Sequence, residues 1–272
     1  MSFVEDIFGL KDKVIIITGG GGVIAGAFSV AFLKAGARIA LLDRKQENID
    51  RQKDNIRSET PLIDNVFGVV ADAADEASVE RAIQETEKAF GKPNVLINAA
   101  GGNRGKTKYI ETDIQAFESI LKLNLIAGLV VPTKVVAKYW IEHGIKGAII
   151  NMTSMASYNP LTGVWAYDAA KAGVLNLTMA TANELAAHGI RVNAIAPGFF
   201  IGKQNKALLI QNEETGELTE RGKNIISRTP FRRFGDVSEL AGAAVYLCSD
   251  RASGFVTGVS LAVDGGYLID NV

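Results

Sequence analysis

The chain has few of the side chains that build disulfides and metal sites. Its 272 residues include one cysteine, Cys248, and two histidines, His143 and His188. A single cysteine forms no internal disulfide, and these three residues are too few for the usual zinc ligand sets. We therefore expect no disulfide and no bound metal. A chain without a cysteine pair is typical of a reducing compartment, which favours a cytoplasmic location.

Long apolar runs and an excess of charge of one sign are also missing. No stretch reaches the roughly eighteen uninterrupted apolar residues of a membrane span. The N-terminal segment MSFVEDIFGLKDK carries acidic residues and lacks the apolar core of a secretory signal. The formal net charge is −1, with 22% charged residues. This balance argues against nucleic acid or an acidic membrane as a partner and favours a small molecule.

What the chain does contain is an alternation of short β-branched runs with longer helical stretches, which predicts parallel βαβ units. Hydrophobic residues make up 47% of it, enough for a large core. We expect strands at 13–19, 38–43, 65–75, 93–102, 147–154, 190–198 and 259–263, and helices at 23–37, 45–57, 78–91, 113–144, 164–189 and 238–250. Pro132 is expected to bend the long helix at 113–144. No linker or repeat interrupts the pattern. The prediction is a single α/β domain over residues 1–272, a Rossmann fold whose doubly wound, seven-stranded parallel sheet has helices on both faces.

The turn after the first predicted strand reads TGGGGVIAG. Gly20, Gly22 and Ala25 satisfy the pattern G-x-G-x-x-G/A. Glycines let backbone N–H groups approach an anion, and the N-terminus of the following helix favours a phosphate. The turn is therefore predicted to bind a dinucleotide, and a glycine-rich turn without a ligand is the alternative. Val23 is β-branched and needs a negative φ, so we expect it in the first helical turn, with Gly19–Gly22 cradling the pyrophosphate.

Asp43 ends the second predicted strand, about twenty residues beyond the glycines, where an acidic side chain accepts hydrogen bonds from the adenosine ribose. The same carboxylate repels a 2′-phosphate, so NAD is favoured over NADP. Arg44 is the counter-argument, because an arginine in the next position can reach such a phosphate. A solvated loop acid is the alternative for Asp43. Asp72, after the third strand, is a weaker candidate for hydrogen bonding to the adenine.

The segment SMASYNPLTGVWAYDAAK contains a candidate proton-transfer group. Ser154, Tyr167 and Lys171 fall at spacings of thirteen and four, so the tyrosine and lysine share one helix face. A tyrosine of ordinary pKa, about 10, transfers protons poorly at neutral pH. A lysine ammonium about 4 Å away contributes about 4 kcal/mol, which would lower the tyrosine pKa by about three units. Ser154 would hydrogen-bond the substrate oxygen. A surface tyrosine packed over a lysine stem is the alternative.

Five motifs in order make the chain resemble the short-chain dehydrogenase/reductase family along nearly its whole length. TGGGGVIAG resembles the family's T-G-x-x-x-G-x-G turn, and NAAG at 98–101 resembles its N-A-G signature. Asn124 matches its catalytic asparagine, and Ser154 with YDAAK matches its serine and Y-x-x-x-K pair. APG at 196–198 follows the sixth strand, as in the family.

The resemblance implies roles for particular residues. Tyr167 would protonate the carbonyl oxygen during reduction while Ser154 holds it. Lys171 would bind the nicotinamide ribose and tune Tyr167, and Asn124 would hold a water that links the lysine to solvent. The expected cofactor-binding residues are Gly19, Gly21, Gly22, Val23, Ile24, Asp43, Asp72, Ala73, Asn98, Ala99, Gly101, Tyr167, Lys171, Pro197, Gly198 and Ile201.

Within the family, the stretches TGGGGV, APGFF and SGFVTGV resemble those of bacterial sugar-acid dehydrogenases of the D-mannonate oxidoreductase (fructuronate reductase) type. This implies interconversion of D-mannonate and D-fructuronate, or of a related keto-gluconate. The resemblance also implies a substrate lid at 203–228. A sugar acid needs hydrogen-bonding groups and a cation for its carboxylate. The residues expected to supply them are Asn103, Arg104, Lys203, Gln204 and Asn205, with a merely solvated loop as the alternative, and Ser154 is the further residue expected to bind the substrate.

Several further features have two interpretations. Arg228, Arg232 and Arg233 form a basic cluster that we interpret as structural or interface residues. Trp165 would line the pocket or pack against a neighbouring subunit. The helices at 113–144 and 164–189 resemble those through which family members assemble as tetramers, so we expect a homotetramer. Packing of both helices against the sheet is the alternative.

Three functions follow from these features. The first is an NAD-dependent oxidoreductase acting on a sugar acid. The second is reduction of a 3-oxoacyl thioester or another hydrophobic ketone, which a pocket without cations would favour. The third is a non-catalytic NAD-binding sensor or scaffold. Ser154, Tyr167, Lys171 and Asn124 argue against this third function, because a protein without catalysis has no chemical need for all four.

Overall fold

A computed structural model describes residues 2–103, 105–201, 209–212 and 215–270. Seven parallel strands form its main sheet, in the order β3-β2-β1-β4-β5-β6-β9. They are β1 (Val14–Thr18), β2 (Arg38–Asp43), β3 (Val66–Val70), β4 (Val95–Asn98), β5 (Ala148–Met152), β6 (Arg191–Pro197) and β9 (Ser260–Val263). This confirms the predicted seven-stranded, doubly wound sheet. The strand order reverses between β1 and β4, which is where ligands bind in such folds.

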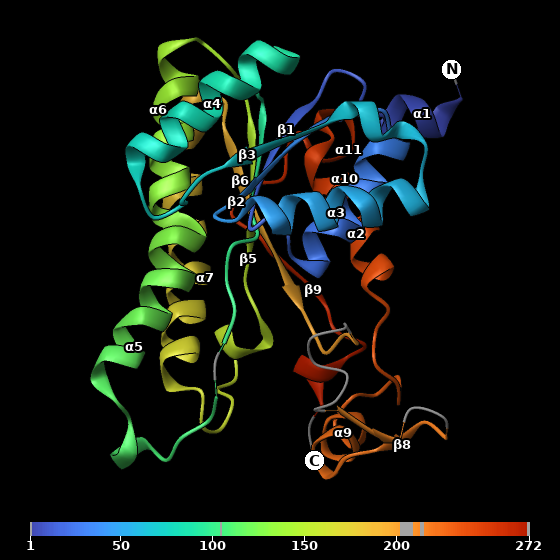
Figure 1. The fold of residues 1–272 in the computed structure, drawn as a ribbon, viewed down its shortest axis with the longest axis vertical. Helices are drawn as coiled ribbons and strands as arrows, with labels where there is room; N and C mark the ends of the chain where they lie inside the picture. The colour runs from blue at the N-terminus through green and yellow to red at the C-terminus, as the bar shows by residue number, and fades with distance from the viewer. Residues whose placement is uncertain (1, 104, 202–208, 213–214, 271–272) are drawn as a thin grey trace.

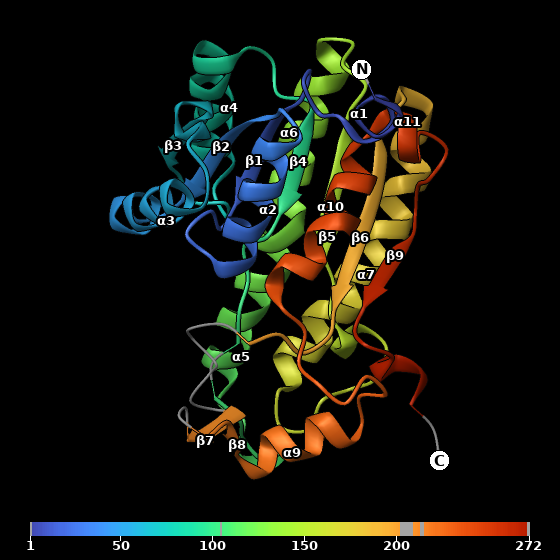
Figure 2. The same cartoon turned by 90° about the vertical axis from the view of Figure 1, so that its right-hand side faces the viewer.

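Helices cover both faces of the sheet (Figures 1 and 2). One face packs on α2 (Val23–Lys34) and α10 (Ala241–Cys248), through Phe28, Phe32 and Leu247. The other face packs on α4 (Glu76–Phe90), α6 (Val131–Glu142) and α7 (Trp165–Leu185), around the fully buried Trp140. The remaining helices of the main body are α1 (Phe3–Phe8), α3 (Gln46–Glu59), α5 (Ile114–Leu121) and α11 (Asp250–Ser253).

The long helical run Ile114–Glu142 departs from regular α-helix before Pro132 rather than at it. Residues Lys122–Val130 form a π-helix between α5 and α6, a conformation that is frequent at functional sites. The proline has no N–H to donate and its ring crowds the preceding turn, so the wide turns lie on its N-terminal side. The run is long and apolar enough to cross a membrane by length and composition alone, but 56% of its most apolar window is buried inside the domain.

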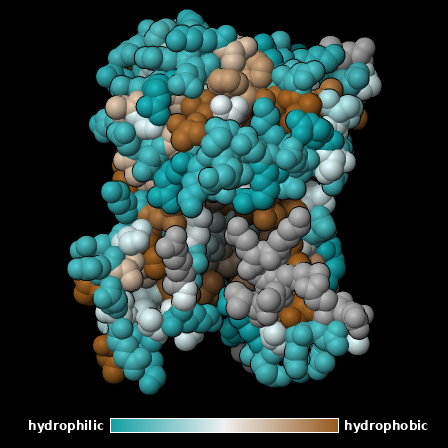
Figure 3. Space-filling model, in the orientation of Figure 1, coloured by the Kyte–Doolittle hydropathy of each residue, from teal (hydrophilic) through white to brown (hydrophobic). Residues whose placement is uncertain are grey.

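The segment after β6 folds beyond the carboxyl ends of the strands. None of the predicted strands and helices falls within 203–228, yet the described part of this segment contains a hairpin and a helix. Strands β7 (Ile210–Asn212) and β8 (Glu217–Leu218) pair in antiparallel fashion, and α9 (Glu220–Ser227) follows. Thr219 caps α9 by accepting a hydrogen bond from Gly222 N at 3.1 Å. Figure 3 shows the surface hollowed between this lobe and the lobe that carries α5.

Candidate active site

The loop between β1 and α2 adopts the expected form. Gly19 has a φ of 63°, and Gly22 is the N-cap of α2, which begins at Val23. Val23 is therefore in the first helical turn with a negative φ, as its branched side chain requires. Gly22 makes no side-chain capping bond. The first backbone N–H groups of α2 thus have no hydrogen-bond partner within the helix, and they point toward the loop. The helix dipole favours an anion at this position.

The loop has no room for side chains. A Cβ at Gly19 would lie 2.8 Å from Ala100 Cα, and a Cβ at Gly20 would lie 2.8 Å from Leu41 Cβ. The backbone of the loop is therefore what an incoming ligand meets. A donor set of backbone N–H groups at a helix N-terminus fits a pyrophosphate, so these residues fit a dinucleotide.

Replacing Gly19 should weaken both folding and cofactor binding. Gly19→Ala puts a methyl group at positive φ and against the Ala100 backbone. We expect the free energy of unfolding to fall by about 2 to 3 kcal/mol, measured by urea denaturation, and NAD affinity to fall as well. Gly242→Ala is the matched control, because no atom lies within 4 Å of that Cβ position. An equal effect of the two substitutions would contradict this role of Gly19.

Asp43 is fixed beside the loop. Its Oδ2 accepts a hydrogen bond from Gly21 N at 3.2 Å. Its Oδ1 accepts hydrogen bonds from Lys45 N at 3.1 Å and from Asn48 Nδ2 at 2.8 Å. The half-buried carboxylate is therefore held in place at the end of β2. A carboxylate has about four acceptor positions, so it retains capacity for a ligand hydroxyl.

A cavity of about 360 Å³ adjoins the loop and reaches the serine, tyrosine and lysine. It brings together most of the predicted cofactor residues, which come from the carboxyl ends of β1, β4 and β6 and from helix α7. Those that line it are Gly19, Gly22, Val23, Ile24, Ala99, Gly101, Tyr167, Lys171, Pro197 and Gly198, together with Ser154. Gly102, Met152, Thr153, Phe199, Phe200 and Val237 also line it and were not predicted.

Other predicted cofactor residues lie outside this cavity. The side chain of Asn98 is buried and donates hydrogen bonds to Thr133 Oγ1 at 2.9 Å and Asn151 Oδ1 at 2.8 Å. The Asn98 side chain therefore ties β4 to its neighbours, and cofactor binding by this residue stays a prediction. Gly21, Asp72, Ala73 and Ile201 do not line the cavity either. Asp72 accepts a hydrogen bond from Ala74 N at 2.9 Å in the turn that follows β3.

Ser154, Tyr167 and Lys171 converge at one end of the cavity. Ser154 follows β5 and caps a short 3-10 helix, Met155–Ser157. Tyr167 and Lys171 share one face of α7, and Lys171 Nζ lies 5.6 Å from the centre of the Tyr167 ring. Lys171 Nζ donates a hydrogen bond to Met152 O at 2.7 Å. The pair therefore faces the cavity and the end of β5, so the surface-pair alternative is wrong.

The ionisation of these groups differs from the expectation. Burial raises the pKa of Tyr167, the nearby Asp168 carboxylate also raises it, and the Ser154 hydroxyl lowers it. Burial lowers the pKa of Lys171 to about 8. The expected lowering of the tyrosine pKa by three units is therefore wrong here. Both side chains are removed from water, and desolvation opposes the charged form of each.

Asn124 lies in the π-helical segment. Its Oδ1 accepts a hydrogen bond from Gly102 N at 2.9 Å, and its Nδ2 donates to Gly102 O at 2.7 Å and Ile120 O at 3.0 Å. A Cβ at Gly101 would lie 2.8 Å from Asn124 Oδ1 and 3.7 Å from Lys171 Nζ. Asn124 thus holds the loop after β4 beside the lysine, which places it next to the other three residues.

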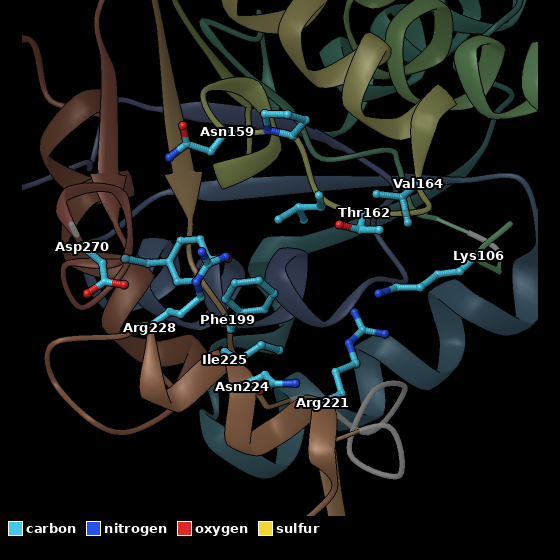
Figure 4. A pocket seen from close by; sticks show the side chains of 13 residues that line it. Lys106, Asn159, Thr162, Val164, Phe199, Arg221, Asn224, Ile225, Arg228 and Asp270 are labelled. Carbon is cyan, nitrogen blue, oxygen red and sulfur yellow. The ribbon is translucent and has the colours of Figure 1, made fainter. Parts of the chain in front are cut away.

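A second, larger cavity of about 680 Å³ lies between α9 and the loop that follows Ser154, and Phe199 lines both cavities (Figure 4). Among the residues that the structure describes, three cationic side chains line it, Lys106, Arg221 and Arg228, with one acidic side chain, Asp270. The remaining lining residues are Asn159, Pro160, Leu161, Thr162, Val164, Phe199, Asn224, Ile225 and Tyr267.

Two of the predicted substrate residues, Asn103 and Ser154, do not line this larger cavity. Asn103 is exposed and donates a hydrogen bond to Gly105 O at 3.1 Å, so its role in substrate binding stays a prediction. Arg104, Lys203, Gln204 and Asn205 lie outside the described residues. Lys106, Arg221 and Asn224 were missed. The spacing of Arg221, Asn224, Ile225 and Arg228 was the available signal, since it marks one helix face.

The residues of the basic cluster and Trp165 have different surroundings. Arg233 donates to both carboxylate oxygens of Glu239, at 2.7 and 2.6 Å, so the structural interpretation is confirmed for it. Arg228 lines the larger cavity, so the structural or interface interpretation stays a prediction for this residue. Trp165 Nε1 donates to Thr107 O at 3.1 Å, and its ring packs edge-on against Tyr109. Trp165 therefore supports the loop after β4.

Comparisons with known proteins agree with this geometry. A family model described as enoyl-(acyl carrier protein) reductase matches residues 22–268. A Haemophilus influenza structure described as a D-mannonate oxidoreductase with bound NAD has a TM-score of 0.87, 33% identity and coverage of 99% of both chains. A gluconate 5-dehydrogenase from Burkholderia cenocepacia, in complex with NADP and tartrate, has a TM-score of 0.85 and 32% identity, with coverage of 99% of this chain and 100% of that one.

A relative from Dickeya dadantii, a 2-dehydro-3-deoxy-D-gluconate 5-dehydrogenase, is 34% identical over 269 residues, which cover 97% of this chain and 99% of the relative. Identity of this level over nearly the whole length adds sequence evidence to the shared fold. The chain therefore belongs to the short-chain dehydrogenase/reductase family of NAD(P)-dependent oxidoreductases.

Proposed function

We propose that the protein interconverts a secondary alcohol and a ketone on a sugar acid, with D-mannonate and D-fructuronate as the first candidates and a keto-gluconate as the next. The observation that carries the proposal is the larger cavity, which adjoins Ser154 and Tyr167 through Phe199 and combines three cations with amide and hydroxyl groups. The cations can bind the carboxylate of a sugar acid, and the amide and hydroxyl groups can hydrogen-bond the hydroxyls of the sugar acid. The relatives described as sugar-acid dehydrogenases support it.

In the proposed mechanism the chain's own residues bind the substrate and move a proton. The chemistry supplied by a bound nicotinamide is hydride transfer. The hydroxyl of Ser154 lies beside that of Tyr167 and holds the substrate oxygen. Tyr167 donates its proton to that oxygen in reduction and accepts it in oxidation. A phenol with a raised pKa stays protonated at neutral pH, which suits the reductive direction.

Lys171 and Asn124 support this proton transfer. Lys171 Nζ, fixed by Met152 O, lies between Tyr167 and the segment around Gly101 where the nicotinamide ribose would lie. Its positive charge stabilises the tyrosinate that forms when Tyr167 gives up its proton. Asn124 keeps the Gly102 backbone in place, and we propose that it also holds the water that relays protons between Lys171 and solvent.

The preferred cofactor in this proposal is NAD. Asp43 is held by Gly21 and Asn48 at the end of β2, where its negative charge disfavours a 2′-phosphate. Among the similar structures, one contains NAD and another NADP. Membership of the family therefore does not decide between NAD and NADP, and the preference depends on local residues such as Asp43.

Removing the Asp43 carboxylate should narrow the cofactor preference. We expect Asp43→Ala to reduce the ratio of kcat/KM for NAD over NADP by about 10- to 100-fold, because a charge-assisted hydrogen bond and a repulsion are lost together. Steady-state kinetics with both cofactors measure it. Asp50→Ala is the control, because that residue bonds only Gln46 on the exposed face of α3. An unchanged ratio in Asp43→Ala would show that the residue does not read the ribose.

The substrate assignment is tested by following NADH oxidation over a panel of keto sugar acids that includes fructuronate and 5-ketogluconate. We expect turnover of at least one of them, and none of a 3-oxoacyl thioester at the same concentration. The cations of the larger cavity argue against a purely hydrophobic ketone. Absence of NADH oxidation with every keto sugar acid of the panel would overturn the sugar-acid proposal.

We also propose a cytoplasmic homotetramer. Apolar side chains project from the helices expected at the interfaces: Ile114 is 66% exposed and Met179 is 48% exposed. At the edge of the sheet, beside β9, Phe255 is fully exposed. Exposed apolar side chains at these positions support burial between subunits.

A further inference from the structure

Helix α9 presents one face to the larger cavity. Arg221, Asn224, Ile225 and Arg228 all line that cavity, and they follow one another at three-, four- and seven-residue spacings from Arg221. Residues at these spacings share a helix face. Ile225 is buried, so this face is anchored at its centre, with a cation at each end. Lys223, on another face, pairs instead with Glu220 at 2.8 Å.

Lys106 approaches the same cavity from the opposite wall. It belongs to the loop after β4, and its position is fixed through its neighbour Thr107. Thr107 N donates to Gly163 O at 3.1 Å, and Thr107 O accepts from Trp165 Nε1 at 3.1 Å. In Figure 4 the ammonium of Lys106 and the guanidinium of Arg221 point toward one another across the cavity.

Neither of these two cations has an acidic partner among the described residues, whereas Lys108 and Arg233 each have one. Lys108 lies 3.5 Å from Glu111, and Arg233 lies 2.6 Å from Glu239. Two like charges facing one another repel, and an anion between them removes that repulsion. Arg228 lies on the other side of the cavity, toward Asp270, where a carboxylate would also meet the Asp270 charge (Figure 4).

We propose that Lys106 and Arg221 form a two-sided clamp for the carboxylate of the substrate, one cation from the loop after β4 and one from α9. Because the two come from different walls of the cavity, a bound carboxylate links α9 to the body of the domain above it. The hydroxyls of the substrate then lie between this clamp and Ser154, along Asn159, Thr162 and Asn224. The clamp rests on the proposed function for the identity of its ligand, a sugar monoacid.

The test uses Lys106→Ala, Arg221→Ala and Arg221→Lys in the full-length protein. KM and kcat are measured for D-mannonate and for its neutral amide, each at low and high salt. We expect either alanine variant to raise the KM for D-mannonate about 10- to 100-fold while kcat changes by less than about threefold. The preference for the acid over the amide should shrink by the same factor, and Arg221→Lys should recover part of it. The salt dependence of KM should also weaken.

Lys223→Ala is the matched control on α9, because Lys223 faces Glu220 rather than the cavity. We expect it to leave all these constants unchanged. Thermal unfolding of each variant shows whether it is folded. An equal rise in KM for the acid and the amide, or no rise in either KM, would overturn the clamp.

A separate readout distinguishes the clamp from the proposed function. D-mannonate is titrated calorimetrically into the protein saturated with NADH, which requires no turnover. Binding that is lost in Arg221→Ala supports the clamp even if the wild type turns over no sugar acid, an outcome that overturns only the proposed function. Wild-type turnover with unchanged binding in both alanine variants would overturn the clamp and leave the proposed function standing.

Discussion

Tyr167→Phe is expected to lower kcat by about 10³-fold at pH 7 while leaving the dissociation constant for NAD within about twofold. The substitution removes only the hydroxyl that gives and takes the proton. The ring still packs beside Lys171 in the cavity wall, so the cofactor meets the same surface. Stopped-flow or steady-state kinetics measure kcat, and NADH fluorescence titration measures binding.

The control for this substitution is Tyr246→Phe, which removes a hydroxyl from α10, outside both cavities. It should leave kcat unchanged. Substantial turnover by Tyr167→Phe would show that another group transfers the proton. Loss of NAD binding together with kcat would show instead that the hydroxyl holds the cofactor.

Lys171→Met is expected to change activity and stability in opposite directions. Turnover should fall by about 10²-fold or more, because the charge that stabilises the tyrosinate is lost. The fold, in contrast, should become more stable at pH 7. Burial lowers the pKa of Lys171 from 10.5 to about 8, a difference that corresponds to about 3 kcal/mol of destabilisation by the buried charge. Lys171→Met also loses the hydrogen bond to Met152 O, which costs about 1 to 2 kcal/mol of stability. The free energy of unfolding should therefore rise by a net amount of about 1 to 2 kcal/mol.

The pH dependence of this stability difference has a defined sign. Below pH 8 the lysine is protonated in the folded and unfolded states, so the full desolvation penalty is present. Between pH 8 and 10.5 the unfolded chain binds more protons than the folded one, so the wild type gains stability as pH rises. The advantage of Lys171→Met should therefore shrink over this window and reverse near its upper end. Urea denaturation at a series of pH values measures it.

Lys138→Met is the control for the pH series, because Lys138 is exposed and lies 4.0 Å from Glu142. Its removal should change stability by less than about 1 kcal/mol at any of these pH values. A Lys171→Met protein that is less stable than the wild type at pH 7 would contradict the buried-charge argument.

Local sequence patterns predicted those features of the site that depend on a few consecutive residues. The glycine-rich turn, Val23 in the first turn of α2, and the shared face of Tyr167 and Lys171 depend on φ preferences and helical periodicity. Asp43 was predicted from its place at the end of β2. All of these are confirmed as geometry, because each involves neighbours within a few residues or the ends of adjacent parallel strands.

The ionisation of the site was not predictable in this way. The pair spacing suggested a strong lowering of the Tyr167 pKa, but the structure buries both groups and ties Lys171 to Met152 O. Desolvation depends on everything packed around a group, and that surrounding comes from strands and loops far apart in the chain.

The sequence by itself therefore determined the sheet and the glycine-rich loop, since backbone preferences and hydrophobic periodicity are local. The four residues proposed for catalysis were indicated by the resemblance of their motifs to those of the family. Only the tertiary structure decided which cations face the substrate. Lys106 and Arg221 are separated by more than a hundred residues and meet only because the loop after β4 and α9 enclose one cavity. It also showed that Asn98 and Arg233 have structural roles. Their partners lie elsewhere in the fold, and no local pattern in the sequence encodes them.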